Sequence, residues 1–250
     1  MRIVVVILCA FFCQLGQVNG QANLLYDEAR ALERQYNTPA AIKKYEESIR
    51  LDPNQMAILV RLAEIHCYTI SEIKEDAAKR AELDKAKSYL DKVSVLDSNS
   101  ADFFYTKALY LGKLIEFSGV KEKAQFTKDI KNVLDKALLI QPEHVKALYT
   151  LAKWNEEVAS LNPAVKAAMK VVFGGLPPAS REEAIELHQK ARKLNPGFIA
   201  NNHDLAVLLK KMAKPSQAME VLQSQMKLPT KTKEELEIKE KSKVLLQSMQ

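Results

Sequence analysis

The stretch AAIKKYEESIRLDPNQ, Ala40 to Gln55, decides the fold because its pattern occurs three more times along the chain. The other copies align without a gap: KAKSYLDKVSVLDSNS (85–100), DIKNVLDKALLIQPEH (129–144) and EAIELHQKARKLNPGF (183–198). Each copy has a small or apolar residue, a large residue four positions later and a third residue three positions beyond: Ala41, Tyr45, Ser48; Ala86, Leu90, Val93; Ile130, Leu134, Ala137; Ala184, His188, Ala191. This spacing places the three side chains on one helical face. Each copy is therefore predicted to be an amphipathic helix, followed by a turn at Pro53, Ser98, Pro142 or Pro196.

A second helix is predicted next to each copy. QMAILVRLAEIH and VKALYTLAKWN follow two of the turns and carry apolar residues three, four and seven positions apart. A small residue recurs where two helix backbones are expected to cross closely: Ala29, Ala63, Ala108, Ala152 and Ala206. The chain is therefore predicted to be a series of helix pairs.

The alternation of helices resembles the tetratricopeptide repeat. First helices restart near residues 22, 56, 101, 145 and 199, at intervals of 34, 45, 44 and 54 residues. Long intervals indicate insertions between paired helices, at about 69–83, 116–127 and 155–180. We expect an all-α, tetratricopeptide-like helical-repeat solenoid, formed as a single domain over residues 21–250. It has about five helix pairs with inserted helices, and residues 233–249 form a C-terminal capping helix.

The third insertion contains a helix with clear end signals, in the sequence SLNPAVKAAMKVVFGGLPPAS. Asn162 and Pro163 favour a helix start, and Gly174-Gly175 followed by two prolines favours its end. Ser180 and Glu183 form a capping box that starts the next helix. The helix over 163–173 is expected to bury one face, with Lys166 and Lys170 turned away; that face comprises Val165, Met169, Val172 and Phe173.

The C-terminal half resembles a known family. LAKWNEEVASL, VVFGGLPPASREEAIELHQKARKLNPGF and MKLPTKTKEELEIKEKSKVLL are similar to the regulator of microtubule dynamics proteins, over about Leu148 to Leu246. The resemblance implies a helical, tetratricopeptide-like and non-enzymatic protein whose relatives associate with microtubules or membranes.

The N-terminus MRIVVVILCAFFCQLGQVNG predicts a secretory signal over residues 1–20, cleaved near Gly20. The mature chain would begin near Gln21 and be secreted or periplasmic. Export would separate it from cytosolic microtubules, so we carry over the family's fold and not its microtubule partner. Cys67 would be the one remaining thiol, and a buried small hydrophobe is favoured over a reactive group.

Charge and motif content favour no enzyme class. The net charge is +6, with basic and acidic residues interleaved as on solvated helices, so nucleic-acid binding is not expected. No nucleotide-binding or hydrolase motif occurs, so we expect no catalytic residues and no cofactor. His66, His144, His188 and His203 lack metal-ligand spacing, and core histidines are expected at 66 and 188. The pair Glu156-Glu157 is interpreted as a solvated helix face.

Binding in a concave groove remains the main functional hypothesis. The groove candidates are the residues that follow the large anchor of each first helix and those four positions further on: Tyr26, Val60, Tyr105, Tyr149 and His203; Arg30, Glu64, Leu109, Lys153 and Val207. Packing between helices would explain the tyrosines almost equally well. We expect a scaffold that binds a protein or peptide. The alternative is a carrier of an apolar small molecule or lipid, with helix 163–173 as a lid through Val165, Met169 and Phe173.

Overall fold

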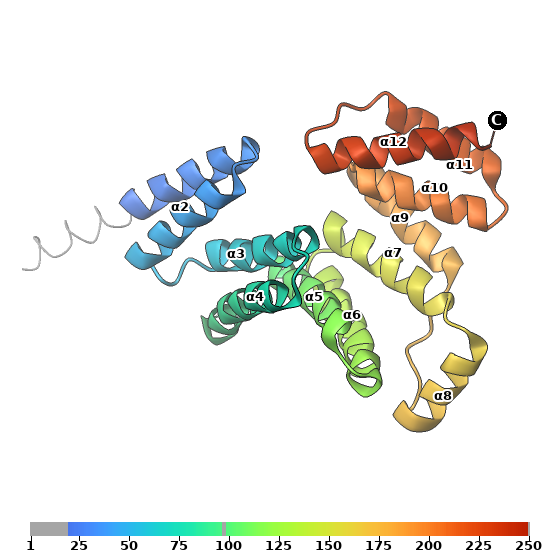
Figure 1. The fold of residues 1–250 in the computed structure, drawn as a ribbon, viewed down its shortest axis with the longest axis horizontal. Helices are drawn as coiled ribbons and strands as arrows, with labels where there is room; N and C mark the ends of the chain where they lie inside the picture. The colour runs from blue at the N-terminus through green and yellow to red at the C-terminus, as the bar shows by residue number, and fades with distance from the viewer. Residues whose placement is uncertain (1–19, 97–98, 250) are drawn as a thin grey trace, which may run out of the picture. The chain divides into compact units, whose positions relative to one another are not determined.

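The computed structural model describes residues 20–96 and 99–249, and these residues form helices joined by short turns (Figure 1). The predicted signal over residues 1–20 lies outside the described residues, apart from Gly20. The chain divides into two compact units at Ser98 and Asn99, which are described separately.

The first unit contains two helix pairs. The first helix covers residues 20–34 and is followed by α2 (Thr38–Leu51), α3 (Met56–Thr69), the short 3-10 helix η1 (Ile70–Glu72) and α4 (Asp76–Leu96). The side chain of Asn37 caps α2 by accepting a hydrogen bond from the Ala40 N–H at 3.3 Å. Helix α3 packs along α4, its partner in the second pair.

The second unit contains three helix pairs, an extra helix and a terminal helix. In order they are α5 (Ala101–Leu114), η2 (Ile115–Phe117), α6 (Val120–Ile140), α7 (Val145–Ala159), α8 (Pro163–Phe173), α9 (Arg181–Leu194), α10 (Ile199–Lys211), α11 (Pro215–Met226) and α12 (Lys233–Gln247). The pairs are α5 with α6, α7 with α9, and α10 with α11. The predicted all-α helical-repeat fold of five helix pairs is confirmed.

The core is built from the repeated positions. The crossing residues Ala29, Ala63, Ala108, Ala152 and Ala206 are all buried, because a larger side chain would separate the paired helices. The twelve residues that define the four aligned helices are also buried, including His188 at 0% exposure. His66 and Cys67 are buried as predicted. The four-and-three spacing therefore identified the buried helical face.

The C-terminal helix α12 closes the second unit as predicted. It packs on α10 and α11, and Leu245, Leu246 and Met249 lie against the apolar core between those helices. Thr232 caps the start of α12 by accepting a hydrogen bond from the Glu235 N–H at 3.0 Å. Covering the last helix pair removes apolar surface that a further repeat would otherwise bury.

The three insertions differ in form. In the first two insertions, a 3-10 turn is followed by residues that extend the second helix of the pair at its start. As a result α4 and α6 have 21 residues each. Only the third insertion forms a separate helix, α8, which Figure 1 shows projecting from α7 and α9. Asn162 caps it by accepting from the Ala164 N–H at 2.8 Å, and Gly174 ends it in a left-handed conformation with φ of 70°. Ser180 caps α9 as expected.

The orientation of α8 differs from the sequence prediction. Val165 is 43% exposed and Val172 is 66% exposed, so the expected burial of this face is wrong. The Nζ atom of Lys166, which was expected to face away, donates a hydrogen bond to the Ala159 carbonyl at 2.8 Å. Met169 and Phe173 are half-buried. The amphipathic pattern was identified correctly, but it does not determine which side of the helix meets the protein.

Candidate functional site

The first helices of the last two pairs, α7 and α10, are joined by polar side chains. The hydroxyl of Tyr149 on α7 donates to Asp204 Oδ2 on α10 at 2.8 Å. The ammonium of Lys153, one turn further along α7, lies 3.2 Å from the same carboxylate oxygen. Tyr149 and Lys153, both predicted groove residues, are thus brought together by an aspartate that sequence analysis did not select.

A second ion pair joins the same two helices further along. Lys211 Nζ on α10 lies 2.7 Å from Glu156 Oε1 on α7, and the Glu156 side chain is only 12% exposed. Glu156 is therefore paired across the helices, and its interpretation as part of a solvated face was wrong. We define the α7–α10 face by the residues Tyr149, Lys153, Glu156, Glu157, Asp204 and Lys211.

Negative charge is in excess on the α7–α10 face, which carries three carboxylates and two ammonium groups. Partial burial raises the pKa of the Glu157 carboxyl above its ordinary value. Lys153 opposes that rise, whereas the charges of Glu156 and Asp204 add to it. Burial is the largest cause of the rise, and the like charges of the two neighbouring carboxylates are smaller contributions to it. A cationic group arriving here would be stabilised by all three carboxylates.

Tyr149 is held by aromatic packing as well as by Asp204. Its ring centroid lies 4.9 Å from that of Phe198 and 5.8 Å from that of His188. His188 lies in the core beneath it, with Nδ1 at 2.8 Å from Asn201 Oδ1. The Asn201 amide is oriented because its Nδ2 donates to the His188 carbonyl at 3.0 Å, so His188 Nδ1 carries the proton. These contacts fix the ring of Tyr149, which is half-buried, while its hydroxyl bonds Asp204.

The predicted groove residues of α10 have different environments. His203 Nδ1 lies 2.8 Å from Ser242 Oγ of α12, and that serine donates its own proton to the Ile238 carbonyl, so His203 is the donor. Burial lowers the pKa of His203, with Asp204 opposing the shift. His203 is thus engaged by the terminal helix. Val207 is half-buried on the same helix.

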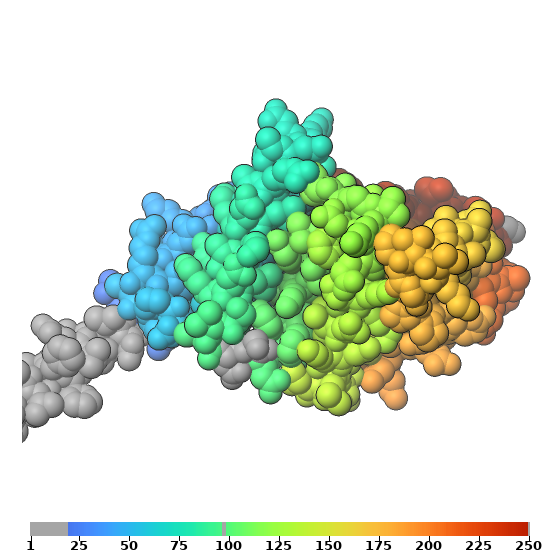
Figure 2. All heavy atoms as spheres, turned by 90° about the horizontal axis from the view of Figure 1, so that it is seen from below, coloured from blue at the N-terminus to red at the C-terminus, as the bar shows by residue number. Residues whose placement is uncertain are grey.

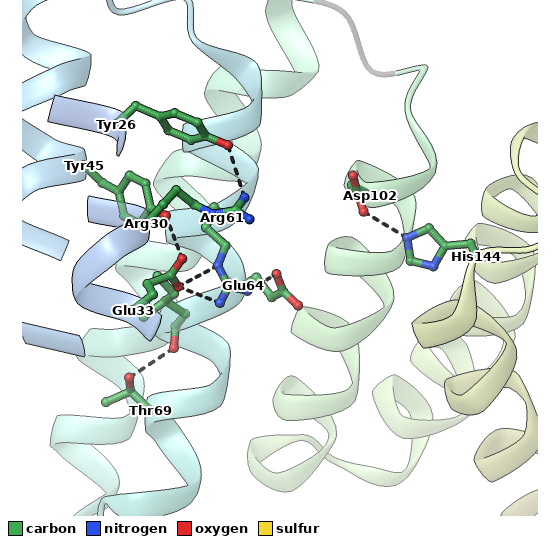
Figure 3. Close-up of polar contacts among 10 residues, drawn as sticks. Tyr26, Arg30, Glu33, Tyr45, Arg61, Glu64, Thr69, Asp102 and His144 are labelled. Carbon is green, nitrogen blue, oxygen red and sulfur yellow. Dashed lines mark hydrogen bonds and ion pairs between the residues drawn. The ribbon is translucent and has the colours of Figure 1, made fainter. Parts of the chain in front are cut away.

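The predicted groove residues of α5 belong mainly to the core. Tyr105 is 4% exposed, and its ring centroid lies 5.3 Å from that of His144. His144 Nδ1 accepts from the Ala147 N–H at 3.0 Å, so Nε2 carries the proton and donates to Asp102 Oδ1 at 2.9 Å (Figure 3). Leu109 is half-buried. Tyr105 therefore packs between elements, which is the alternative that the sequence left open.

In the first unit, a polar network links the helix over residues 20–34 with α2 and α3 (Figure 3). Arg61 donates from Nε at 2.8 Å and from NH2 at 2.6 Å to Glu33 Oε1, and Tyr45 donates to Glu33 Oε2 at 2.6 Å. Arg61 also pairs with Glu64, which is buried. Burial would lower the pKa of Arg61, but the carboxylates raise it overall. Glu64 is consequently part of a structural ion-pair network.

The other candidates of the first unit are not gathered into a comparable site. The Tyr26 hydroxyl accepts a hydrogen bond from Arg30 at 3.2 Å, and the guanidinium also lies over the ring, 5.9 Å from its centroid. Arg30 is exposed, Tyr26 is half-buried and Val60 is buried. The predicted groove positions of this unit therefore include exposed, half-buried and buried residues.

Within residues 20–96 and 99–249, no group of three or more His, Cys, Asp or Glu side chains is arranged to hold a metal ion. No helix in this part of the chain has both the length and the apolar character needed to cross a membrane.

The fold and the helix-pair geometry define a tetratricopeptide-like helical-repeat protein. A solved thermophilic tetratricopeptide-repeat protein of Thermus thermophilus superposes with a TM-score of 0.63 at 12% identity, covering 90% of this chain and 99% of that one. The pilF protein of Pseudomonas aeruginosa gives a TM-score of 0.55 at 15% identity, covering 93% and 88%. At these identities the similarity establishes the fold alone.

The chain belongs to the regulator of microtubule dynamics family, because the family model for regulator of microtubule dynamics proteins 1–3 matches residues 25–250. Regulator of microtubule dynamics protein 3 of Mus musculus is 25% identical over 178 residues, which cover 71% of this chain but only 38% of that protein. Protein 1 of Caenorhabditis elegans is 24% identical over 183 residues, covering 72% and 80%. The predicted family resemblance is confirmed, and the match extends beyond the C-terminal half.

Proposed function

We propose that this chain is a non-enzymatic scaffold that binds an extended protein segment on the α7–α10 face. The observation that carries the proposal is the row of polar side chains joining α7 and α10, with the half-buried Tyr149 fixed at one end and the Lys211–Glu156 pair at the other. The helical-repeat fold supports this role, because solenoids of stacked helix pairs form extended binding surfaces.

The charge of the face favours a partner segment that contains lysine or arginine. The three carboxylates Glu156, Glu157 and Asp204 exceed the two ammonium groups, so the face carries a net negative charge. A cationic side chain can pair with Glu157 without breaking the ion pairs of Asp204 and Glu156. Tyr149 adds a fixed aromatic surface against which an apolar or cationic side chain can pack.

The test is selection of peptides from a random displayed library on the full chain, followed by affinity measurement with the selected peptides. We expect enrichment of basic peptides whose affinity falls about tenfold in Glu157→Gln plus Asp204→Asn, because a charged hydrogen bond contributes roughly 1.5 to 3 kcal/mol. The matched control is Glu220→Gln plus Glu186→Gln, which removes two exposed carboxylates from α11 and α9. Equal loss in both variants, or selected peptides without basic residues, would contradict the proposal.

A second candidate function is a carrier of an apolar molecule, with α8 as the lid. The observation that favours it is an open pocket of about 470 Å³ between α8, the end of α7 and the 174–179 segment. Met169, a predicted lid residue, lines this pocket together with Leu176 and Pro177. Native mass spectrometry of protein incubated with lipid distinguishes the candidates, since a scaffold that binds only peptides takes up no lipid.

Export of the chain is also a proposal, and it rests on the pattern of residues 1–20 alone. The family name refers to microtubules, which an exported chain would not meet in the cytosol. We therefore propose a partner in the compartment to which the signal leads. Retention of Met1 in the purified protein would return the microtubule partner to consideration.

A further inference from the structure

The outward face of α8 consists only of alanine and valine. At 100° per residue, six side chains occupy one continuous sector of the helix, and all six are exposed: Ala164, Val165, Ala167, Ala168, Val171 and Val172. Val171 is 86% exposed and Val172 is 66% exposed. This face offers no hydrogen-bonding side chain along the whole length of the helix. A repeated apolar face of this kind is unusual on a surface that meets only water.

The polar side of α8 is formed by two lysines, which are exposed to water on the side of the helix that borders the rest of the unit. Lys166 and Lys170 lie one turn apart and line the pocket between α8 and the 174–179 segment. Lys166 is held by the Ala159 carbonyl, and Lys128 of α6 donates to the carbonyl of Phe173 at the other end. Both ends of α8 are thus fixed so that its valines point outward.

The surroundings of this face are positively charged. Residues 158–181 contain three basic residues and no acidic residue, and residues 120–131 at the start of α6 contain four lysines and two carboxylates. Figure 2 shows α8, in yellow to orange, at the surface beside α6 in lime green, and the Lys128 contact with Phe173 agrees with this view. Val120, the first residue of α6, is 69% exposed. The apolar face therefore has a basic border.

A second copy of the chain is a poor occupant for this face. A symmetric pair would bring the same lysines together, and like charges repel. In addition, an 11-residue helix is about 16 Å long, and such a strip is much smaller than the roughly 800 Å² per partner of a stable interface. An acidic helix of another protein would satisfy the charge. However, it would leave a contact without hydrogen bonds, and protein interfaces usually contain one per 100–200 Å².

We propose that the outer face of α8 lies against a negatively charged membrane surface. A short helix with only lysines on its polar side and only apolar residues on the other matches the pattern of helices that lie in the plane of the membrane interface. The valines enter the boundary between headgroups and acyl chains, while the lysines remain on the water side within the range of the surface potential. Val171 and Val172 are 86% and 66% exposed, so a membrane surface can contact their side chains.

The test is co-sedimentation of the full chain with vesicles of phosphatidylcholine containing 30% phosphatidylserine, and with vesicles of phosphatidylcholine alone. The variant Val171→Asp plus Val172→Asp is expected to bind the anionic vesicles at least about tenfold more weakly, because two apolar contacts become charges that the surface repels. Lys166→Gln plus Lys170→Gln is expected to weaken binding by up to about fivefold for each lysine and to reduce its salt dependence.

The control is Val95→Asp plus Val244→Asp, which places the same charges on α4 and α12. These valines are 85% and 65% exposed, and so match Val171 and Val172 at 86% and 66%. All variants share the apolar run of residues 3–12, so its contribution cancels in the comparison. Equal binding of both aspartate variants to the anionic vesicles, or a preference for anionic vesicles that Lys166→Gln plus Lys170→Gln does not reduce, overturns the proposal. Sedimentation velocity showing self-association that only the α8 variant loses, without vesicle binding, also overturns it in favour of a second copy.

Discussion

Replacement of His188 by asparagine tests the conclusion that a neutral imidazole is part of the core. His188 has no exposed surface, its Nδ1–H donates to Asn201, and its Nε2 has no partner among the described residues. Burial lowers the pKa of His188 below 6.5, although the hydrogen bond with Asn201 and the charge of Asp204 oppose the shift. An asparagine at this position can donate a hydrogen bond from its amide to Asn201 Oδ1, as the Nδ1–H of His188 does, and its side chain does not titrate.

The magnitude follows from the difference in proton binding. Because the folded-state pKa is depressed, the unfolded chain binds more protons below pH 6.5, and stability is lost as the pH falls through this window. Between pH 7.5 and 5.5 an unfolded histidine of pKa 6.5 contributes a loss of about 1.4 kcal/mol, provided that the folded state stays unprotonated. His188→Asn should be less stable at pH 7.5 through lost ring packing. Between pH 7.5 and 5.5 the variant should lose about 1.4 kcal/mol less free energy of unfolding than the native chain does.

Trp154 provides the assay. It is the single tryptophan of the chain and lies on α7 in the same unit as His188. Urea unfolding followed by its fluorescence gives the free energy of unfolding at each pH for both proteins. His203, whose pKa is also lowered, is present in both and cancels in the difference. If the two proteins lose the same free energy of unfolding, within about 0.5 kcal/mol, the neutral-core assignment of His188 is refuted.

Three further predictions concern two substitutions and the N-terminus of the exported protein. Arg61→Leu leaves the carboxylates of Glu33 and Glu64 without their cation, and since Arg61 is 32% exposed we expect a loss of about 2 kcal/mol in thermal unfolding, less than for a fully buried pair. Tyr105→Ala should cost about 3 to 5 kcal/mol through core packing, and a variant of native stability that loses peptide binding would instead support the groove assignment. N-terminal sequencing of exported protein should begin near Gln21, whereas Met1 retained in a membrane fraction would contradict cleavage.

The sequence by itself determined the helical-repeat fold and its core. The reason is periodicity: residues four and three positions apart share a helical face, so Ala41, Tyr45 and Ser48 identify the buried side without knowledge of the neighbouring helix. Crossing positions such as Ala152 and Ala206 were also evident, because only a small side chain allows two backbones to approach. End signals at Asn162 and Gly174 are equally local, since a cap requires only nearby backbone groups.

Only the tertiary structure decided which surface residues meet. Tyr149 and Asp204 are 55 positions apart, and their hydrogen bond depends on how α7 and α10 are set by α9 between them. The same is true of Tyr105, which became a core residue through contact with His144. The pattern of α8 showed two faces, but it carried no information about which face the protein would cover. That choice depends on contacts at the two ends of the helix. Lys166 bonds Ala159 from the preceding helix, whereas the contact of Lys128 with Phe173 joins residues 45 positions apart and forms only when distant segments pack.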